Sequence, residues 1–321
     1  MDTVGEELRP RAGLPGDADA DVAIVGAGYT GLWTAYYLAA ADPSLRVAVV
    51  EREIAGYGAS GRNGGWCSAY LPTPLPKLAR RHGRDAAVAM QRAMHATIDE
   101  VGRVARAEGI DCHWAKGGAV AVARSKTQLK RARAAVAEAA SFGFGRDDVA
   151  LLDAREAAAR CGATGVLGGV YTPHCAAIHP ARLARGLAAA VQRRGVSVYE
   201  RTPALRIRPG AVETPAGTLR AEVVIRATEG YTPQLPGHGR TIAPVYSLMV
   251  ATEPLPDSFW AGAGLAERET FTDFRTMIIY GQRTADGRLA FGGRGAPYHF
   301  GSKIRPEYDR EPHVFADLRR T

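Results

Sequence analysis

The pattern of apolar and polar positions predicts that strands and helices alternate at the start of the chain. Residues 22–25 are four apolar residues in a row, typical of a buried parallel strand, and residues 46–51 (RVAVVE) form a second such run. Between them, residues 30–41 have helical composition and are followed by Asp42-Pro43, where a helix is expected to end. This strand–helix–strand order indicates a parallel sheet.

Farther along, the same signals predict both helices and strands. Helices are expected over residues 84–108, 126–140 and 180–194, the last with Pro180 at its first position. Short strands are expected at 117–123, 168–172, 196–200, 204–207 and 221–228, and a long strand at 241–252. Residues 276–293 contain two β-rich arms around Asp286-Gly287 and predict a hairpin. Residues 53–78, rich in Gly, Ser and Pro, are expected to form a loop.

This order of elements predicts an α/β fold with two interleaved domains. We expect a Rossmann-like, doubly wound nucleotide-binding domain and a second, sheet-rich α+β domain. Residues 21–80 and 150–240 are assigned to the nucleotide-binding domain, and residues 81–149 and 241–321 to the second one. Residues 1–20 are expected to form a polar N-terminal arm.

The uncharged run from Val22 to Ala41 has two interpretations. Such a run is long enough to span a bilayer, but Gly26, Gly28 and Gly31 (GAGYTG) lie near one end of it, which favours strand, turn and helix. In that arrangement the first glycine permits the sharp turn and the second lets the backbone approach a pyrophosphate. The third lets the helix pack against the strand.

An acidic residue follows at the distance expected for a dinucleotide site. Glu51 ends the second strand about 20 residues after the last glycine, where a carboxylate accepts hydrogen bonds from a ribose diol. The neighbouring Glu53 is an alternative for this role. The first helical turn offers its N–H groups to phosphates. The motif therefore predicts dinucleotide binding, without distinguishing NAD from FAD.

The segment GYGASGRNGG, residues 56–65, favours a flavin. Ser60 can reach a phosphate oxygen, and Gly64 and Gly65 can bring bare backbone against a flat ring. Arg62 and Asn63 add a cation and an amide nearby. The alternative is a flexible glycine-rich loop with no ligand.

Composition excludes some classes of function. The net charge is +8, but the basic residues are mostly Arg, scattered among Ala and acidic residues, which indicates a solvated surface and no nucleic-acid site. The four cysteines form no CxxC pair and residues 1–20 carry acidic groups without an apolar run. We therefore expect a cytoplasmic protein without a secretory signal or membrane span. No metal-ligand spacing and no Ser/His/Asp triad is evident, so no metal is expected.

Several of these motifs together resemble a known family. GAGYTGLWTAYYL (26–38), VVERE (49–53) and GASGRNGG (58–65) resemble the D-amino-acid oxidase-like FAD oxidoreductases. More narrowly, they resemble the branch with glycine and sarcosine oxidases and γ-glutamylputrescine oxidase-like proteins. Residues 176–204, 225–237, 243–256 and 280–298 match that branch too, so the resemblance covers nearly the whole chain after residue 20.

The resemblance implies that FAD is the cofactor, that the nucleotide-binding domain is an FAD-binding domain and that the second is a substrate domain. The adenine and ribose would lie near Glu51, Arg52 and residues 202–204, the phosphates near the glycine turn, Ser60, Ala227 and Thr228, and the ring near residues 62–65. The implied cofactor-binding residues are Gly26, Gly28, Tyr29, Thr30, Gly31, Glu51, Arg52, Ser60, Gly61, Arg62, Asn63, Gly64, Gly65, Thr202, Pro203, Ala204, Ala227 and Thr228.

The resemblance also implies the chemistry. A small primary or secondary amine, or an amino acid, would transfer a hydride from the C–H bond beside nitrogen to flavin N5. The imine would then hydrolyse, and electrons would pass to O2 or another acceptor. Candidate catalytic residues are Arg62, Tyr246, Tyr280 and Arg294, and Arg275 is also expected on the substrate sheet. The alternative interpretation is that these are ordinary Tyr and Arg side chains on a half-exposed sheet, with no catalytic role.

The chain departs from the family pattern at its end. Family members return to the nucleotide-binding domain with a last strand and helix, but nothing after Gly293 resembles that glycine-rich segment. EPHVFADLRRT (311–321) is expected to begin a helix in the substrate domain. We therefore expect part of the flavin site to be missing and a seam to be exposed. Two alternatives stay open: a shortened, catalytically incompetent relative or binding module, and an NAD-dependent dehydrogenase, which residues 56–65 oppose. The oligomeric state is not predicted.

Overall fold

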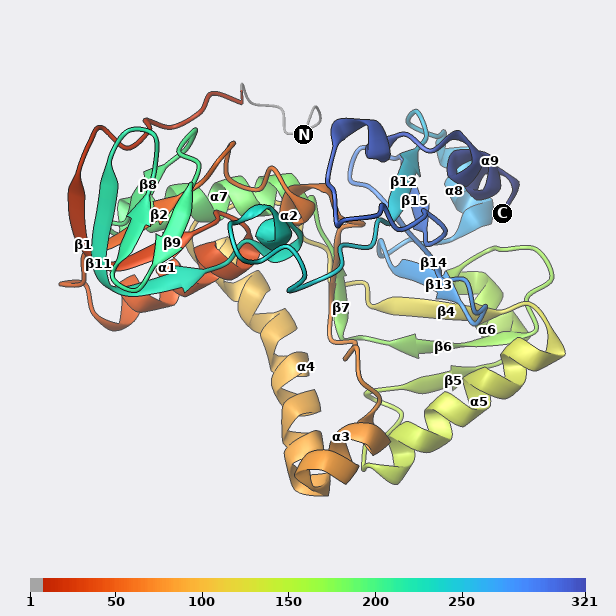
Figure 1. Ribbon diagram of the computed structural model, residues 1–321. Helices are drawn as coiled ribbons and strands as arrows, with labels where there is room; N and C mark the ends of the chain where they lie inside the picture. Colours follow the sequence, from red (N-terminus) through yellow and green to blue (C-terminus); the bar gives the residue numbers. More distant parts are fainter. Residues whose placement is uncertain (1–7) are drawn as a thin grey trace.

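Two sheets organise the chain, of which the computed structural model describes residues 8–321. The first sheet has six strands in the order β8-β2-β1-β11-β10-β9 (Figure 1). Its parallel part consists of β1 (Ala18–Val25), β2 (Val47–Val50), β8 (Ser197–Tyr199) and β11 (Thr218–Arg226). The short strands β9 (Arg206–Arg208) and β10 (Ala211–Glu213) continue it in antiparallel fashion. The predicted α/β fold is confirmed.

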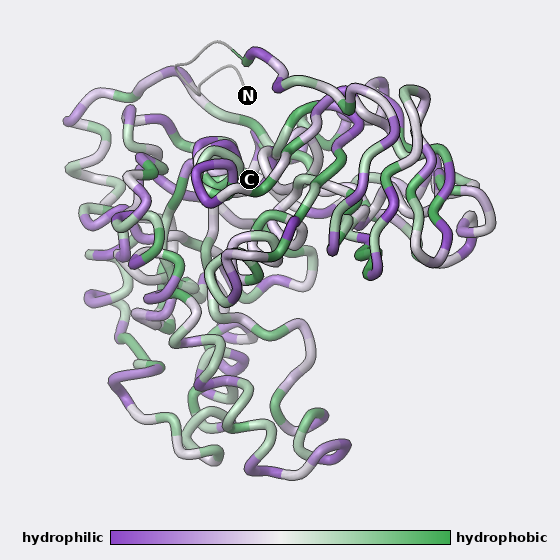
Figure 2. Tube along the Cα trace, turned by 90° about the vertical axis from the view of Figure 1, so that its left-hand side faces the viewer, coloured by the Kyte–Doolittle hydropathy of each residue, from purple (hydrophilic) through white to green (hydrophobic). Residues whose placement is uncertain are grey.

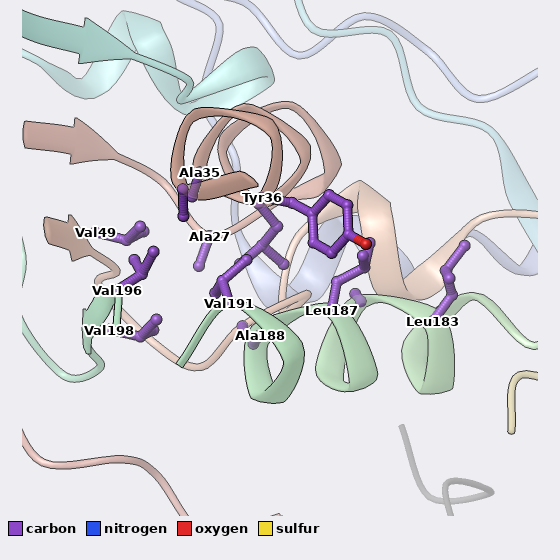
Figure 3. Close-up of a cluster of buried hydrophobic side chains, with 14 of the residues drawn as sticks. Ala27, Ala35, Tyr36, Val49, Leu183, Leu187, Ala188, Val191, Val196 and Val198 are labelled. Carbon is purple, nitrogen blue, oxygen red and sulfur yellow. The ribbon is translucent and has the colours of Figure 1, made fainter. Parts of the chain in front are cut away.

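Two helices cover one face of this sheet and bury its largest core. These are α1 (Tyr29–Ala41) and α7 (Pro180–Arg193), the latter with Pro180 at its start as expected. Figure 3 shows Tyr36 of α1 above Leu187 and Val191 of α7, with Val49 and Val198 of the strands beside them. Burying each such aliphatic side chain stabilises the fold by about 1.5–3 kcal/mol.

The second sheet has seven strands in the order β12-β15-β14-β13-β4-β6-β5. Its strands are β4 (Ala119–Ala123), β5 (Ala150–Leu152), β6 (Gly168–Thr172), β12 (Leu248–Ala251), β13 (Thr270–Asp273), β14 (Ile279–Arg283) and β15 (Leu289–Gly293). The hairpin predicted around Asp286-Gly287 is the β14–β15 pair. The helices around it are α5 (Lys126–Ser141), α6 (Ala154–Arg160), α8 (Asp257–Ala263) and α9 (Pro312–Arg320). As expected, the last helix packs on this sheet, against β12 and β15.

Short elements join the two sheets. The strands β3 (Trp66–Ser68) and β7 (Cys175–Ala177) form a two-stranded ladder between them, and α2 (Ala59–Arg62) precedes β3. In Figure 1 the long helix α4 (Arg84–Ala107) runs down from the first sheet to α3 (Leu75–His82). Two 3-10 helices, η1 (Glu229–Gln234) and η2 (Pro306–Asp309), complete the fold.

Three expectations from the sequence differ from the structure. The strands at 150–152 and 168–172 pair in the second sheet, although residues 150–240 were assigned to the nucleotide-binding domain. The long strand expected at 241–252 is only β12, because Pro244 lacks the N–H group that a sheet ladder requires. Residues 53–78 contain α2, β3 and the start of α3 where a loop was expected.

The part of the predicted polar arm that the structure describes packs on the first sheet; residues 1–7 lie outside the described part. Leu14 is buried against the first sheet and β1 already begins at Ala18. The edge of β11 that faces away from β1 is only partly paired. β10 pairs with residues 218–220 of β11, and beyond them this edge has no strand beside it among the described residues; Val223 there is 48% exposed.

The uncharged run of the sequence is divided between β1 and α1. No helix within residues 8–321 is long and apolar enough to cross a membrane. Figure 2 shows apolar and polar stretches alternating along the chain.

The arm is fixed by a carboxylate that is completely buried. Glu200, at 0% exposure, accepts hydrogen bonds from the Arg11 side chain (2.8 Å), the Arg11 backbone N–H (2.7 Å) and the Ala55 backbone N–H (2.8 Å). Arg185 lies 3.8 Å from the same carboxylate. The charge is therefore compensated by two guanidinium groups and two amides.

We predict that Glu200→Gln lowers the free energy of unfolding by about 3 kcal/mol, because two partly buried guanidinium groups would then face a buried neutral amide. Urea denaturation measures this loss. The control is Glu213→Gln, which removes an exposed ion pair with Arg208 and is expected to cost less than about 1 kcal/mol. Equal losses in the two variants would show that burial does not set the cost.

Candidate functional site

A hollow opens at the carboxyl ends of β1, β2 and β11, where α/β sheets commonly bind nucleotides. We call it the first hollow; its volume is about 230 Å³. It brings together residues from four separate segments that the sequence had pointed to. The predicted cofactor residues that line it are Gly26, Gly28, Glu51, Arg52, Ser60, Thr202, Ala204, Ala227 and Thr228.

The glycine turn is packed so closely that side chains are excluded. Gly26 has φ +109°, and a Cβ atom placed on it would lie 2.4 Å from the carbonyl oxygen of Ala227. A Cβ atom on Gly31 would lie 2.0 Å from the carbonyl oxygen of Gly26. These contacts seat the first turn of α1 directly against the ends of β1 and β11.

The N-terminus of α1 borders the first hollow. Its N-cap residue, Gly28, provides no side-chain cap, and the Tyr29 N–H donates a hydrogen bond to Ser60 Oγ at 2.9 Å. A Cβ atom on Gly28 would lie 2.9 Å from that oxygen. An uncapped helix N-terminus with a serine hydroxyl beside it is an arrangement that binds phosphate groups.

The structure separates the two acidic candidates. Glu51 accepts hydrogen bonds from the backbone N–H groups of Ala27 (2.8 Å) and Glu53 (3.0 Å), and burial raises the pKa of Glu51. Both carboxylates line the first hollow, but Glu53 pairs with exposed Arg201 at 2.6 Å. Glu51 is therefore the carboxylate whose position is fixed by the glycine turn itself.

The helix η1 closes the first hollow with residues that the sequence analysis missed. Arg52 donates to Gln234 Oε1 at 2.6 Å, and its guanidinium lies 5.0 Å from the centre of the Tyr231 ring. At the start of η1, Glu229 adopts φ +40°, a left-handed conformation that is costly for a residue other than glycine. A short 3-10 helix has no apolar period, so the apolar pattern of the sequence did not predict this wall.

The loop after α2 lies directly against the second sheet. Asn63 holds the loop, accepting from the Gly65 N–H (2.8 Å) and donating to the Ser60 carbonyl (2.9 Å). A Cβ atom on Gly64 would lie 2.7 Å from the Tyr280 ring. A Cβ atom on Gly65, where φ is +68°, would lie 2.0 Å from the side-chain nitrogen Nε2 of Gln282. The structure thus brings the predicted flavin loop together with β14.

Gln282 joins the two sheets at this loop and was also missed. Its side chain is buried, and its Nε2 donates to the carbonyls of Gly64 (2.9 Å) and Ile178 (3.2 Å). Nearby, Trp66 Nε1 donates to the Gly281 carbonyl at 3.2 Å. Strand alternation could have indicated this residue, because it lies two positions after Tyr280 and therefore on the same face.

Of the catalytic candidates, Tyr280 lies beside the flavin loop. Its hydroxyl is 2.7 Å from Ser247 Oγ, burial raises the pKa of its phenol, and Trp66 contacts its ring edge-on at 6.3 Å between centroids. Arg294 is exposed and follows β15 directly. Tyr280 is thus the candidate whose side chain the packing holds in place.

The other candidates point elsewhere. Arg62 pairs with Asp309 at 2.9 Å and lies over the ring of Tyr57, which lines the first hollow although Arg62 does not. Tyr246, which precedes β12, packs against the apolar cluster of α9 and β12. Arg275 is held by Asp273 at 2.7 Å.

The other predicted cofactor residues do not line the first hollow; these nine are Tyr29, Thr30, Gly31, Gly61, Arg62, Asn63, Gly64, Gly65 and Pro203. Only the backbone of Tyr29 takes part, because its hydroxyl donates to the Pro180 carbonyl at 2.9 Å. Thr30 is exposed on the first turn of α1, and Gly61 is buried within α2.

We predict that Gly31→Ala weakens nucleotide binding at least about tenfold and lowers the free energy of unfolding by about 2–3 kcal/mol, because the added methyl would force the turn apart. Gly262 in α8 is the matched control, since a Cβ atom there meets nothing within 4 Å. Gly262→Ala should leave stability unchanged or slightly higher. Urea denaturation and a binding titration measure both effects; a Gly31→Ala protein that behaves like the control contradicts this account.

Comparison with known proteins agrees with this geometry. The family described as FAD dependent oxidoreductase matches residues 21–321, which confirms the resemblance stated from the motifs. A probable oxidoreductase OrdL of Rhizobium meliloti is 32% identical over 291 residues, covering 88% of this chain and 66% of that protein. The gamma-glutamylputrescine oxidoreductase of Escherichia coli is 30% identical over 284 residues, covering 85% of this chain and 64% of that protein. The chain thus spans about two thirds of the length of these relatives.

Solved structures share the fold. Glycine oxidase from Geobacillus kaustophilus superposes with a TM-score of 0.68 at 23% identity, covering 94% of this chain and 76% of that one. L-proline dehydrogenase from P. horikoshii superposes with a TM-score of 0.72 at 16% identity, covering 96% and 76%. FAD is the cofactor of the matched family, and the closely packed glycine turn, the uncapped helix and the fixed Glu51 fit it. The chain belongs to the FAD-dependent oxidoreductase family.

Proposed function

We propose that the protein binds FAD in the first hollow and oxidises a small amine or amino acid at the carbon next to nitrogen. The observation that supports this most is the packing of Gly26, Gly31 and Ala227, which leaves an uncapped helix N-terminus facing the hollow. When bound, FAD supplies the acceptor for the two electrons of the C–H bond, and the resulting imine hydrolyses in water.

On the nucleotide side, each residue has a distinct task. Glu51 accepts hydrogen bonds from the adenosine ribose, and the N–H groups of α1 with Ser60 hold the phosphates. Arg52 and Tyr231 cover the adenosine end, since both line the first hollow. Gly64 and Gly65 present bare backbone to the ring, on a loop that Gln282 fixes to the second sheet.

On the substrate side, aromatic side chains provide the binding surface. Trp66 lies 6.3 Å from Tyr280 and 6.4 Å from Tyr70, measured between ring centroids. Faces of such rings attract a substrate ammonium and exclude water from the reacting carbon. A hydrogen-bonded Tyr280 hydroxyl orients the amine next to the loop of Gly64.

The names of similar proteins agree with this class of substrate. They include a gamma-glutamylputrescine oxidoreductase, a glycine oxidase and an L-amino acid deaminase from Proteus vulgaris. Each of these names refers to an amine or an amino acid, which is the substrate class that we propose, with O2 or another acceptor taking the electrons. The cytoplasmic location expected from the cysteines stays a prediction.

We predict that the purified protein carries FAD and that Glu51→Gln lowers its affinity for FAD about tenfold or more. The substituted amide would place an N–H group against a backbone donor, either Ala27 or Glu53. Glu53→Gln is the control and should change the affinity by about twofold at most, because its partner Arg201 is exposed. Flavin absorbance and fluorescence of the released cofactor measure both.

Two results would favour the alternatives. A colourless protein that takes up no flavin would support a catalytically incompetent relative or binding module. Tight binding of NADH in a fluorescence titration, with no flavin bound, would support an NAD-dependent dehydrogenase.

We predict that amine-dependent reduction of the flavin, followed with a panel of primary and secondary amines and amino acids, slows in Tyr280→Phe. The loss of the hydroxyl is expected to lower kcat/KM about tenfold. The control is Tyr298→Phe, whose hydroxyl also bonds a serine, Ser302, at 3.0 Å, but which is 49% exposed. Release of hydrogen peroxide then distinguishes O2 from another acceptor. Equal rates in the two variants would exclude Tyr280 from substrate orientation.

A further inference from the structure

Three metal-ligating side chains meet outside the first hollow. His95 lies on α4, Asp148 precedes β5, and His174 lies between β6 and β7. Asp148 Oδ1 is 3.0 Å from His174 Nε2 and 3.6 Å from His95 Nδ1. One ligand atom from each side chain can be chosen so that all lie within 4.8 Å of one another. We call these three residues the His–Asp–His cluster; their spacing along the chain carries no metal signature, so the sequence analysis missed it.

The cluster borders a second hollow of about 330 Å³. Both histidines line it, together with Tyr70, Gln91 and Glu138. None of its lining residues also lines the first hollow. A ligand held by the cluster would therefore have room beside it and would not compete with the proposed FAD site.

The two imidazole rings are held close together by the surrounding backbone. Their centroids lie 3.6 Å apart with an interplanar angle of 7°. The His174 carbonyl accepts a hydrogen bond from the Ala69 N–H at 3.1 Å, and the edge of His95 is packed against Phe144 at 5.4 Å. The three residues are thus brought together by three different segments of the fold.

One nitrogen of the cluster lacks a partner. His174 Nδ1 is buried and makes no hydrogen bond within residues 8–321. Buried polar atoms are nearly always paired, because an unpaired one costs about 1–3 kcal/mol. An unpaired imidazole nitrogen among further nitrogen and oxygen ligands is expected where an additional group completes the arrangement.

We propose that the His–Asp–His cluster binds one Zn²⁺ ion, with two imidazole nitrogens and one carboxylate oxygen as ligands and the remaining position open to the second hollow. This donor set is one that zinc accepts. In the stacked arrangement the lone pairs of the rings run side by side, so one ring must turn about its Cβ–Cγ bond to bring both nitrogens onto one ion. The bound ion would tie α4 to the segment before β5 and to the connection between β6 and β7.

The test uses the full chain without an affinity tag, treated with a chelator to remove metal. The protein is titrated with Co²⁺, because the visible absorption of this ion reports ligation by nitrogen and oxygen. The bound Co²⁺ is then displaced with Zn²⁺. We expect one equivalent to bind to the unsubstituted protein. Asp148→Asn and His174→Asn should each weaken binding at least about tenfold. The control is His82→Asn, which changes an exposed histidine of α3 and should bind as the unsubstituted protein does.

Thermal unfolding provides a second measurement on the same proteins. Zn²⁺ should raise the melting temperature of the unsubstituted protein and of His82→Asn, because a ligand that binds only the folded state stabilises it. It should not raise that of Asp148→Asn, whose near-isosteric side chain preserves packing. Two results would overturn the proposal: the unsubstituted protein binds neither metal ion, or Asp148→Asn and His82→Asn bind it equally well. The cluster would then be a stacked pair of histidines that share a carboxylate. Neither result depends on flavin content or amine oxidation.

Discussion

The close approach of backbone to backbone at the glycine turn is the constraint on which the first sheet and its site depend. The carbonyl of Gly26 faces Gly31, and the carbonyl of Ala227 faces Gly26, at distances that leave no room for a side chain. Because β1, α1 and β11 meet at these atoms, the same contact sets the position of the helix and the depth of the first hollow. Packing and ligand binding therefore rest on the same few atoms.

A second set of contacts connects this arrangement to the second sheet. The loop of Gly64 and Gly65 follows α2, whose Ser60 bonds the start of α1, and it ends in the hydrogen bonds of Gln282. A single chain of contacts thus runs from the glycine turn to β14. Trp66 and Tyr280 are positioned relative to the loop of Gly64 and Gly65 by hydrogen bonds as well as by aromatic packing.

The parts of this architecture that depend on local pattern could be predicted from the sequence. The turn at Gly26–Gly31, the acidic Glu51 and the hairpin at Asp286-Gly287 each follow from the conformations that a few adjacent residues permit. The parts that depend on distant pairing could not. Short apolar strands such as β5 and β6 carry no information about which sheet they join, so the sequence analysis assigned them to the wrong domain. The partners of Tyr246, on α9 and η2, and those of Gln282 lie on segments far away in the chain.

The buried carboxylate of Glu200 has a consequence for the arm that precedes the first strand. Arg11 supplies both a guanidinium and a backbone N–H to that carboxylate, while Ala55 anchors it from the segment after β2. The arm therefore lies against the first sheet and supplies one of the cations that compensate the buried carboxylate. A protease cut or an engineered deletion could remove the arm and spare every strand and helix. The buried Glu200 carboxylate would then lose the Arg11 guanidinium. The smallest segment that folds stably therefore begins before β1.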